Sequence, residues 1–207
     1  MRNEDIFANN FQDIKGTQSK HYHDINTGNT RPIKKQPYWI QYQYINWLKK
    51  ELQIMEENRI IRKSNSPWAF PMIIVPKKGD SEEFSPRAVV DYHWVNDLIL
   101  KDRYPMPRID DILVSIGPYL LFFSIIDMFS GFHQFLLIED TIKKSAFITP
   151  FRQWEYLKMP FRLCNAPTSF QHVMQDILWD LIGKVCFVYI DDISVFTSTF
   201  EEHLLVL

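Results

Sequence analysis

The sequence lacks the features of a secreted or membrane-spanning protein. It has two cysteines, Cys164 and Cys186, too few for the disulfide framework of a small secreted domain. The first ten residues, MRNEDIFANN, contain no apolar signal core. The longest apolar run, YLLFFSII before Asp127, is too short to span a bilayer. These absences predict a soluble intracellular protein with no membrane partner.

An excess of charge of one sign is lacking as well. The 23 basic and 25 acidic residues give a net charge of −2, so a nucleic-acid partner has to be inferred from a local basic patch. Residues 59–108 have nine Lys or Arg against six Asp or Glu, an excess that an ordinary charged surface can also have. The sequence does contain 46% hydrophobic and 15% aromatic residues. In 207 residues, these are enough for one sizeable core or two closely packed subdomains.

Helices and hairpins are predicted to alternate along the chain. Helical spacing of apolar residues occurs over residues 41–58 (Ile45, Leu48, Leu52, Met55) and 166–182 (Phe170, Met174, Ile177, Leu181), and a short helix is expected at 108–116. Strands are predicted at 72–75 and 88–92, a buried strand at 120–127, and hairpins within 144–159 and 185–196. Residues 1–36 are polar and are expected to form a linker or extended arm. Without a regular βαβ rhythm, this order predicts an α+β fold.

Two adjacent aspartates, Asp191 and Asp192, interrupt the apolar stretch VCFVYIDDISVF. One interpretation is that they simply form a hairpin turn, where Asp is common. Three details favour a metal site. The pair lacks the glycine usual in a two-residue hairpin. Like charges among apolar neighbours call for a nearby cation. Finally, a third carboxylate, Asp127, ends another apolar strand, and converging carboxylates suit Mg²⁺ and phosphoryl transfer.

Strand geometry limits how these carboxylates can act together. Neighbouring residues on an extended strand point to opposite faces, so Asp191 and Asp192 cannot contribute equally unless the turn bends sharply between them. We therefore expect one of the two to join Asp127 as a principal ligand while the other supports it.

Nine blocks of the sequence, in order, resemble the reverse transcriptases of gypsy-type long-terminal-repeat retrotransposons. They cover about residues 20–207 and are INTGNTRPIKKQPYWI, RIIRKSNSPWAFPMIIVPKK, VVDYHWVND, KDRYPMPRIDDIL, FSIIDMFSGFHQF, KSAFITPF, LKMPFRLCNAPTSFQ, VYIDDISVF and EEHLLVL. The resemblance implies a right-hand polymerase, with an antiparallel palm sheet backed by helices. It implies fingers at 37–101 and 135–164, and a palm at 102–134 and 165–207 that is truncated before the primer grip and thumb.

The resemblance also implies an activity and its partners. A primer 3′-hydroxyl would attack the α-phosphate of a deoxynucleoside triphosphate on an RNA or DNA template. Asp127, Asp191 and Asp192 would be catalytic metal ligands, joined by the backbone carbonyl of Met128. Two Mg²⁺ ions are implied, with Mn²⁺ able to substitute. In an intact element, the rest of the pol polyprotein (thumb, RNase H and integrase) would accompany the chain, in the cytoplasm or in virus-like particles.

Five further positions match residues that bind the nucleotide in this family. Lys77 and Arg87 would contact the triphosphate, although surface cations are usually just solvated. Ser130 and Gly131 would offer backbone N–H groups, although they fit a turn equally. Phe132 would crowd a ribose 2′-hydroxyl, or else be an ordinary core residue.

Some positions depart from the family pattern. Arg162 in MPFRL replaces a glycine, which usually marks a positive φ or a close backbone approach. Its side chain is a suspected inactivating block or, alternatively, an outward-turned phosphate contact. Arg152 also replaces a common glycine, and His93 replaces an arginine. The chain is therefore either a functional polymerase fragment or a degenerate, inactive remnant that folds and binds nucleic acid. An unrelated metal-binding α+β domain is the third reading.

Overall fold

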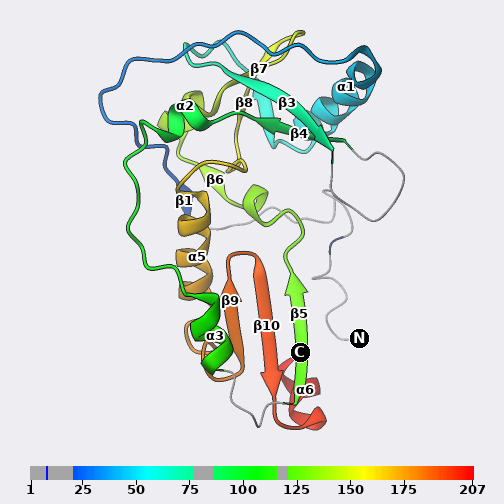
Figure 1. The fold of residues 1–207 in the computed structure, drawn as a ribbon, viewed down its shortest axis with the longest axis vertical. Coiled ribbons are helices and arrows are strands. Elements are labelled where there is room, and N and C mark those ends of the chain that lie inside the picture. Colours follow the sequence, from blue (N-terminus) through cyan, green and yellow to red (C-terminus); the bar gives the residue numbers. More distant parts are fainter. Residues whose placement is uncertain (1–7, 9–20, 77–85, 116–120) are drawn as a thin grey trace. The chain divides into compact units, whose positions relative to one another are not determined.

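The computed structural model describes residues 8, 21–76, 86–115 and 121–207. They form two compact units, which are considered separately. Unit 1 contains the described residues up to Leu100 together with Phe132–Cys164, and unit 2 contains Lys101–Gly131 and Asn165–Leu207 (Figure 1). The predicted α+β composition is confirmed, because each unit combines an antiparallel or mixed sheet with helices. No helix in the described parts of the chain is long and apolar enough to cross a bilayer.

Unit 1 is built on a five-stranded sheet in the order β2-β8-β7-β3-β4. Its strands are β2 (Ile61–Lys63), β3 (Phe70–Pro76), β4 (Pro86–Val90), β7 (Phe147–Ile148) and β8 (Gln153–Tyr156). A separate parallel pair joins β1 (Tyr22–His23) to β6 (Leu136–Leu137). The helical elements are α1 (Tyr42–Glu57), α2 (His93–Asn96), α4 (Glu139–Ile142) and η3 (Lys143–Ser145).

The predicted first helix is confirmed as α1, and it buries Leu48, Leu52 and Met55. These side chains recur at three- and four-residue spacing, which gathers them on one face of a helix. The segment expected to be a linker or extended arm is in part packed on unit 1. Ile25 is fully buried, and its carbonyl accepts a hydrogen bond from Lys144 Nζ at 2.8 Å. Scattered single apolar residues such as Ile25 carry no period, so the sequence alone does not reveal this packing.

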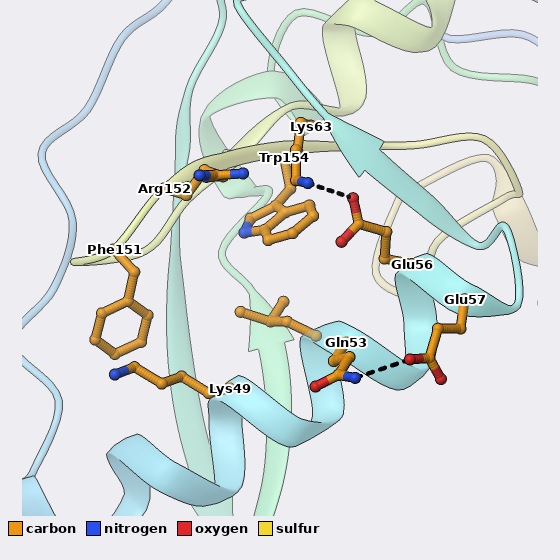
Figure 2. A pocket seen from close by; sticks show the side chains of 9 residues that line it. Lys49, Gln53, Glu56, Glu57, Lys63, Phe151, Arg152 and Trp154 are labelled. Carbon is orange, nitrogen blue, oxygen red and sulfur yellow. Dashed lines mark hydrogen bonds and ion pairs between the residues drawn. The ribbon is translucent and has the colours of Figure 1, made fainter.

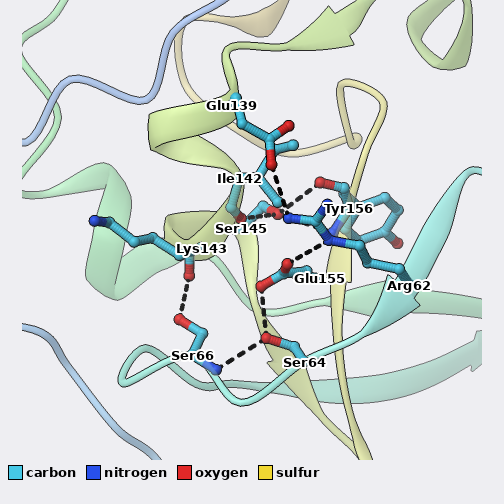
Figure 3. A network of polar contacts seen from close by, with 9 residues as sticks. All are labelled: Arg62, Ser64, Ser66, Glu139, Ile142, Lys143, Ser145, Glu155 and Tyr156. Atoms are coloured by element: carbon cyan, nitrogen blue, oxygen red, sulfur yellow. Dashed lines mark hydrogen bonds and ion pairs between the residues drawn. The ribbon is translucent and has the colours of Figure 1, made fainter.

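A polar network ties β2 to β8 and α4 (Figure 3). Arg62 Nε donates to Glu155 Oε1 at 2.7 Å, and its Nη2 donates to Glu139 Oε1 at 3.1 Å. Ser64 Oγ donates to the second oxygen of Glu155 at 2.6 Å. Glu155 is buried, and the bonds that it accepts from Arg62 and Ser64 are charge-assisted. These two bonds hold the edge strand β2 in register against β8.

His133 is a buried histidine of unit 1 whose ring lies 5.1 Å from Phe161 and 6.1 Å from Tyr156. Burial and the charge of Lys158 lower its pKa from 6.5 to about 4. Since the folded state holds the neutral ring, the stabilisation is complete above pH 6.5 and is lost as the pH falls toward 4. The free energy of unfolding should fall by up to about 1.4 kcal/mol per pH unit in this window. Denaturant titrations at several pH values should show that the free energy of unfolding of His133→Phe depends less steeply on pH between 6.5 and 4. An equally steep pH dependence would contradict a role for His133 in it.

Unit 2 contains a three-stranded antiparallel sheet in the order β5-β10-β9. Its strands are β5 (Phe122–Asp127), β9 (Cys186–Tyr189) and β10 (Asp192–Thr197), and its helices are α3 (Ile109–Ser115), α5 (Ala166–Ile177) and α6 (Phe200–Val206). The short 3₁₀ helix η2 (Gly131–Gln134) begins at Gly131, the last residue of the Lys101–Gly131 segment of unit 2. Strand β5 was expected to be buried, but Phe123 and Ile125 are 52% and 74% exposed on one face of it. Apolar content alone therefore overstated the burial of this strand.

Helix α5 ends earlier than predicted. Apolar spacing suggested a helix to residue 182, whereas α5 stops at Ile177, and both Ile177 and Leu181 are exposed. The chain continues in tight turns that include Gly183 at φ +78°, whose N–H donates to the carbonyl of Cys186. Helical spacing of apolar residues is the same in sequence whether the backbone continues as a helix or as such turns.

The last helix, α6, is fastened to the sheet of unit 2 through His203. Thr197 Oγ1 donates to the carbonyl of Thr199, so its hydroxyl accepts from His203 Nδ1 at 3.0 Å. The other ring nitrogen, Nε2, is 2.8 Å from Ser124 Oγ on β5. These contacts connect β5, β10 and α6, and so stabilise the sheet that carries the aspartates.

Candidate metal and nucleotide-binding site

The two adjacent aspartates lie at a tight hairpin, but they occupy different positions in it. Tyr189 on β9 pairs with Asp192 on β10, which leaves Ile190 and Asp191 as a two-residue loop. Asp191 is therefore the second loop residue and is half-buried, whereas Asp192 is the exposed first residue of β10. The sharp bend between them frees both carboxylates from the strict alternation of an extended strand.

The third carboxylate lies directly across the sheet. Asp127, the last residue of β5, is the register partner of Asp192 on β10. Directly opposed residues of an antiparallel pair have Cα atoms about 4.5–5.5 Å apart and side chains on the same face. The loop that follows β5 also contacts the hairpin, because the Met128 N–H donates to the carbonyl of Asp191 at 3.3 Å. The structure thus brings Asp127, Asp191 and Asp192 together at one end of the sheet.

The three carboxylates influence one another electrostatically. The pKa of Asp191 is raised above its usual value mainly because burial disfavours its charged form. A backbone hydrogen bond opposes this effect, and the negative charges of Asp192 and Asp127 raise the pKa further. The cluster is therefore destabilised by like charge, a condition that a bound cation relieves.

The donor set fits a hard divalent cation only in part. Across the described residues, no three His, Cys, Asp or Glu side chains are grouped closely enough to enclose a metal ion by themselves. Carboxylates and a backbone carbonyl are nonetheless the oxygen ligands that such cations take. Mg²⁺ is usually held by one or two carboxylates, with substrate phosphates and water completing its shell. The arrangement of Asp127, Asp191 and Asp192 therefore fits an ion that is bound jointly with a substrate.

The hairpin turn is supported by Gln171, a residue to which no sequence motif assigned a role. Ile190 has φ +57°, a left-handed conformation that is unusual for a β-branched side chain. Its N–H donates to Oε1 of Gln171 at 2.7 Å, and Nε2 of Gln171 donates to the carbonyl of Val188 at 3.1 Å. Gln171 is fully buried on α5. The signal for this role in the sequence was a glutamine among the apolar residues of the predicted helix.

The loop after β5 contains several sequence-predicted site residues. The Met128 carbonyl accepts a hydrogen bond from the Gly131 N–H at 3.2 Å, so this N–H is used within the loop. Ser130 is half-buried and has φ +51°. A Cβ on Gly131 would lie 3.0 Å from the Phe170 ring, which makes this glycine a site of close approach between the loop and α5.

The remaining nucleotide-binding candidates belong to unit 1 or lie outside the described residues. Phe132 is 8% exposed and packs 5.0 Å from the ring of Phe161. Arg87 is exposed on β4, opposite Val75 of β3. Lys77 and the charged loop around it are outside the described residues. Within unit 2, only Ser130 and Gly131 accompany the aspartates.

Arg162 has the backbone conformation that its replacement of a glycine suggested. Its φ is +71°, and its side chain is exposed. Its carbonyl accepts a hydrogen bond from Asn96 Nδ2 at 2.8 Å, and Asn96 Oδ1 accepts from the Cys164 N–H at 2.9 Å. The residue also lines a hollow of about 320 Å³ in unit 1, together with Ile73, Val90, Asp91, Tyr92, His93 and Asn96.

Arg162→Gly should stabilise the protein. A left-handed backbone costs an L-residue about 1–2 kcal/mol, while glycine loses about 0.5–1 kcal/mol more chain entropy on folding. A net gain of about 0.5–1 kcal/mol in the free energy of unfolding is expected. Arg59→Gly is a matched control, since Arg59 is also exposed and has φ +53°. Denaturant titration should give similar gains for both variants, and a loss for Arg162→Gly alone would mean that its side chain makes a stabilising contact.

His93, which departs from the family pattern, contacts a carboxylate two residues before it. Its Nδ1 lies 2.8 Å from Asp91 Oδ1, and Tyr38 Oη donates to the other oxygen of Asp91 at 3.1 Å. Burial raises the pKa of Asp91, but hydrogen bonds from His93 and Tyr38 outweigh it, so that the pKa lies below its usual value. Asp91 therefore stays ionised at the edge of the hollow.

A second hollow of unit 1, about 640 Å³, lies between α1 and the β7–β8 turn (Figure 2). Lys63 pairs with Glu56 at 3.3 Å, and Gln53 donates to Glu57 at 2.8 Å. Because its lining mixes the cations of Lys49, Lys63 and Arg152 with the carboxylates of Glu56 and Glu57, it lacks the uniform positive charge of a phosphate site. No sequence motif pointed to it.

Comparison with known proteins adds to this geometry. Residues 75–207 match the family described as reverse transcriptase (RNA-dependent DNA polymerase). The chain is 40% identical over 183 residues to the retrovirus-related Pol polyprotein from transposon 297 of Drosophila melanogaster, and 34% identical over 182 residues to that from transposon gypsy. These matches cover 88% and 87% of this chain but 17% and 18% of the relatives, so the chain spans less than a fifth of their length.

Solved structures of foamy viral protease-reverse transcriptase are also similar. The complex with an RNA/DNA hybrid matches with a TM-score of 0.78 and 25% identity, over 89% of this chain and 24% of that one. The complex with double-stranded DNA matches with a TM-score of 0.80 and 25% identity, over 92% of this chain and 39% of that one.

Proposed function

Since the chain belongs to the reverse transcriptase family and has its α+β fold, we propose that it forms the fingers and palm of an RNA-directed DNA polymerase. Unit 1 corresponds to the fingers and unit 2 to the palm. The reaction is addition of a deoxynucleotide to a primer 3′-hydroxyl with release of pyrophosphate. The observation that carries the proposal is the register of Asp127 with Asp192, beside Asp191 in the adjoining loop.

Members of this family use divalent metal ions. Here Asp127, Asp191 and Asp192 would hold Mg²⁺, or Mn²⁺ in its place, with the Met128 carbonyl as a further ligand. Two such ions, when bound, would activate the primer hydroxyl and neutralise charge on the triphosphate. The protein supplies the fixed backbone that presents the carboxylates at one end of the sheet.

The other site residues act on the nucleotide. Lys77 and Arg87 would stabilise the negative charge of the transferring phosphoryl group. Ser130, with the Gly131 backbone, would border the triphosphate. Phe132 would reject ribonucleotides by crowding their 2′-hydroxyl.

The template strand would contact an aromatic and basic surface of unit 1. Lys35 Nζ lies 3.4 Å from the ring centroid of Trp94, and that ring lies 4.1 Å from His93. Trp39 is 82% exposed nearby in sequence. Exposed aromatic rings and adjacent cations suit the bases and phosphates of a single strand. Template, primer and dNTP are therefore the proposed partners, with the remaining Pol domains in an intact element, in the cytoplasm or virus-like particles.

The second candidate is a degenerate remnant that folds and binds nucleic acid without catalysis. Arg162 favours it, because this arginine keeps a conformation suited to glycine and lines the hollow beside Asp91 and His93. In this reading the catalytic carboxylates persist, while the approach of template or nucleotide is obstructed.

Primer extension on poly(rA)/oligo(dT) with Mg²⁺ or Mn²⁺ tests the two candidates. Extension by the unaltered chain supports the polymerase. Extension by Arg162→Gly alone identifies a sound scaffold with one inactivating lesion. No extension by either, together with retained binding of the primer–template, favours the remnant.

A further inference from the structure

The turn that carries Asp191 is under conformational strain. Ile190 adopts φ +57°, a left-handed conformation in which a β-branched L-residue is sterically strained. Two-residue hairpin loops normally place Gly, Asn or Asp at a position of this kind. A residue in a strained conformation persists only when surrounding contacts stabilise it. Other residues must therefore stabilise the left-handed conformation of Ile190.

The support comes from a single side chain. Gln171 is fully buried, and its amide bridges two residues of the hairpin. Its Oε1 accepts from the Ile190 N–H at 2.7 Å, and its Nε2 donates to the Val188 carbonyl at 3.1 Å. Because one end accepts and the other donates, neither an apolar side chain nor a carboxylate can make both bonds.

The same helix contacts the other acidic segment. Phe170, next to Gln171, lies 3.0 Å from where a Cβ on Gly131 would stand. The Gly131 N–H in turn donates a hydrogen bond to the carbonyl of Met128, the residue after Asp127. Thus α5 touches both the hairpin loop and the loop after β5, all within unit 2.

We propose that Gln171 is a positioning residue, which holds the Ile190–Asp191 turn in its strained conformation and so fixes Asp191 and Asp192 relative to Asp127. This inference deepens the proposed function and rests on it for the role of the metal. The side chain touches neither substrate nor metal. It acts through the backbone of the turn, and its loss should loosen the carboxylates without removing any of them.

The test compares Gln171→Met, Ile190→Gly and the double variant in the full chain, with the Mn²⁺ ion alone as the probe. Methionine is unbranched and of similar length, but it cannot bridge the two backbone groups. Gln171→Met should speed hydrogen exchange at the Ile190 amide about tenfold beyond any change in global opening. It should also weaken Mn²⁺ affinity, measured by electron paramagnetic resonance, about tenfold.

The double variant separates positioning from simple packing. Glycine adopts positive φ without steric cost, so Ile190→Gly should restore most of the Mn²⁺ affinity lost in Gln171→Met. Gln175→Leu on the same helix is the matched control. Gln175 Oε1 accepts a hydrogen bond from Tyr104 Oη instead of bonding to the hairpin. This variant should leave Mn²⁺ affinity unchanged.

Two results would overturn the inference: unchanged exchange and affinity in Gln171→Met, or lost affinity that Ile190→Gly does not recover. If Gln171→Met does not fold, Gln171→Asn, one methylene too short to span both partners, takes its place. If the unaltered chain binds no Mn²⁺, the proposed metal chemistry fails, while exchange at the Ile190 amide still decides the role of Gln171.

Discussion

Asp191→Asn is expected to reduce metal-dependent nucleotide addition by roughly 10²–10³-fold, the loss typical when a group that stabilises transition-state charge is removed. Asn keeps the size of the side chain but not the negative charge that a hard cation requires. Single-turnover extension of a primer by one nucleotide measures the effect. Asp180→Asn is the matched control, because Asp180 is an exposed aspartate of unit 2 in the turn after α5.

The same substitution should slightly stabilise the metal-free protein. The pKa of Asp191 is raised in the folded state, chiefly by burial and then by Asp192 and Asp127, so its ionised form opposes folding. Stability from this group is present below its ordinary value of 3.8 and is lost as the pH rises through its folded pKa. Removing the charge should therefore gain about 0.5 kcal/mol at neutral pH, a small value because the half-buried group is still partly screened by solvent. Slower chemistry together with lower stability would instead indicate a structural role for Asp191.

Glu155→Ala should destabilise the protein by about 3 kcal/mol, since it removes two charge-assisted hydrogen bonds of a buried carboxylate. Arg62 Nε and Ser64 Oγ both donate to Glu155, and together they hold β2 against β8 (Figure 3). Arg62 is half-exposed, so it remains partly solvated after the change. Denaturant titration of the free energy of unfolding measures the loss.

Glu139→Ala is the control for this network. Glu139 also accepts from Arg62, at 3.1 Å, but its side chain is 76% exposed. Exposed ion pairs contribute about 0–1 kcal/mol, so this variant should lose far less stability than Glu155→Ala. Equal losses for the two variants would mean that burial of Glu155 adds nothing to the strength of the network.

Local patterns predicted several of the main elements of the fold. The spacing of Leu48, Leu52 and Met55 predicted α1, and the apolar stretches on either side of Asp191 predicted β9 and β10. Each of these depends on residues close in sequence, whose periodicity reports which face is buried. The glycine expected at position 162 also indicated a positive φ, which Arg162 has.

Features that depend on distant residues could not be predicted in this way. The sequence suggested that Asp127 and Asp192 converge, but their pairing as opposed residues depends on the register of β5 with β10, which side-chain types alone do not specify. The conformation of Ile190 contradicts its local preference: the two-residue loop requires it, and the buried Gln171, 19 residues away, bonds to the Ile190 N–H. Local rules fail at this turn because the surrounding structure overrides them.

Mn²⁺ titration of the full chain, followed by electron paramagnetic resonance, tests most directly whether the three aspartates form one cation site. Bound Mn²⁺ should be detected with the unaltered chain and should be weakened at least about tenfold by either Asp127→Asn or Asp191→Asn. The control Asp180→Asn should bind like the unaltered chain. Affinity that is unchanged in both Asp127→Asn and Asp191→Asn would contradict the account, because the carboxylates brought together by β5 and β10 would then not be the ligands.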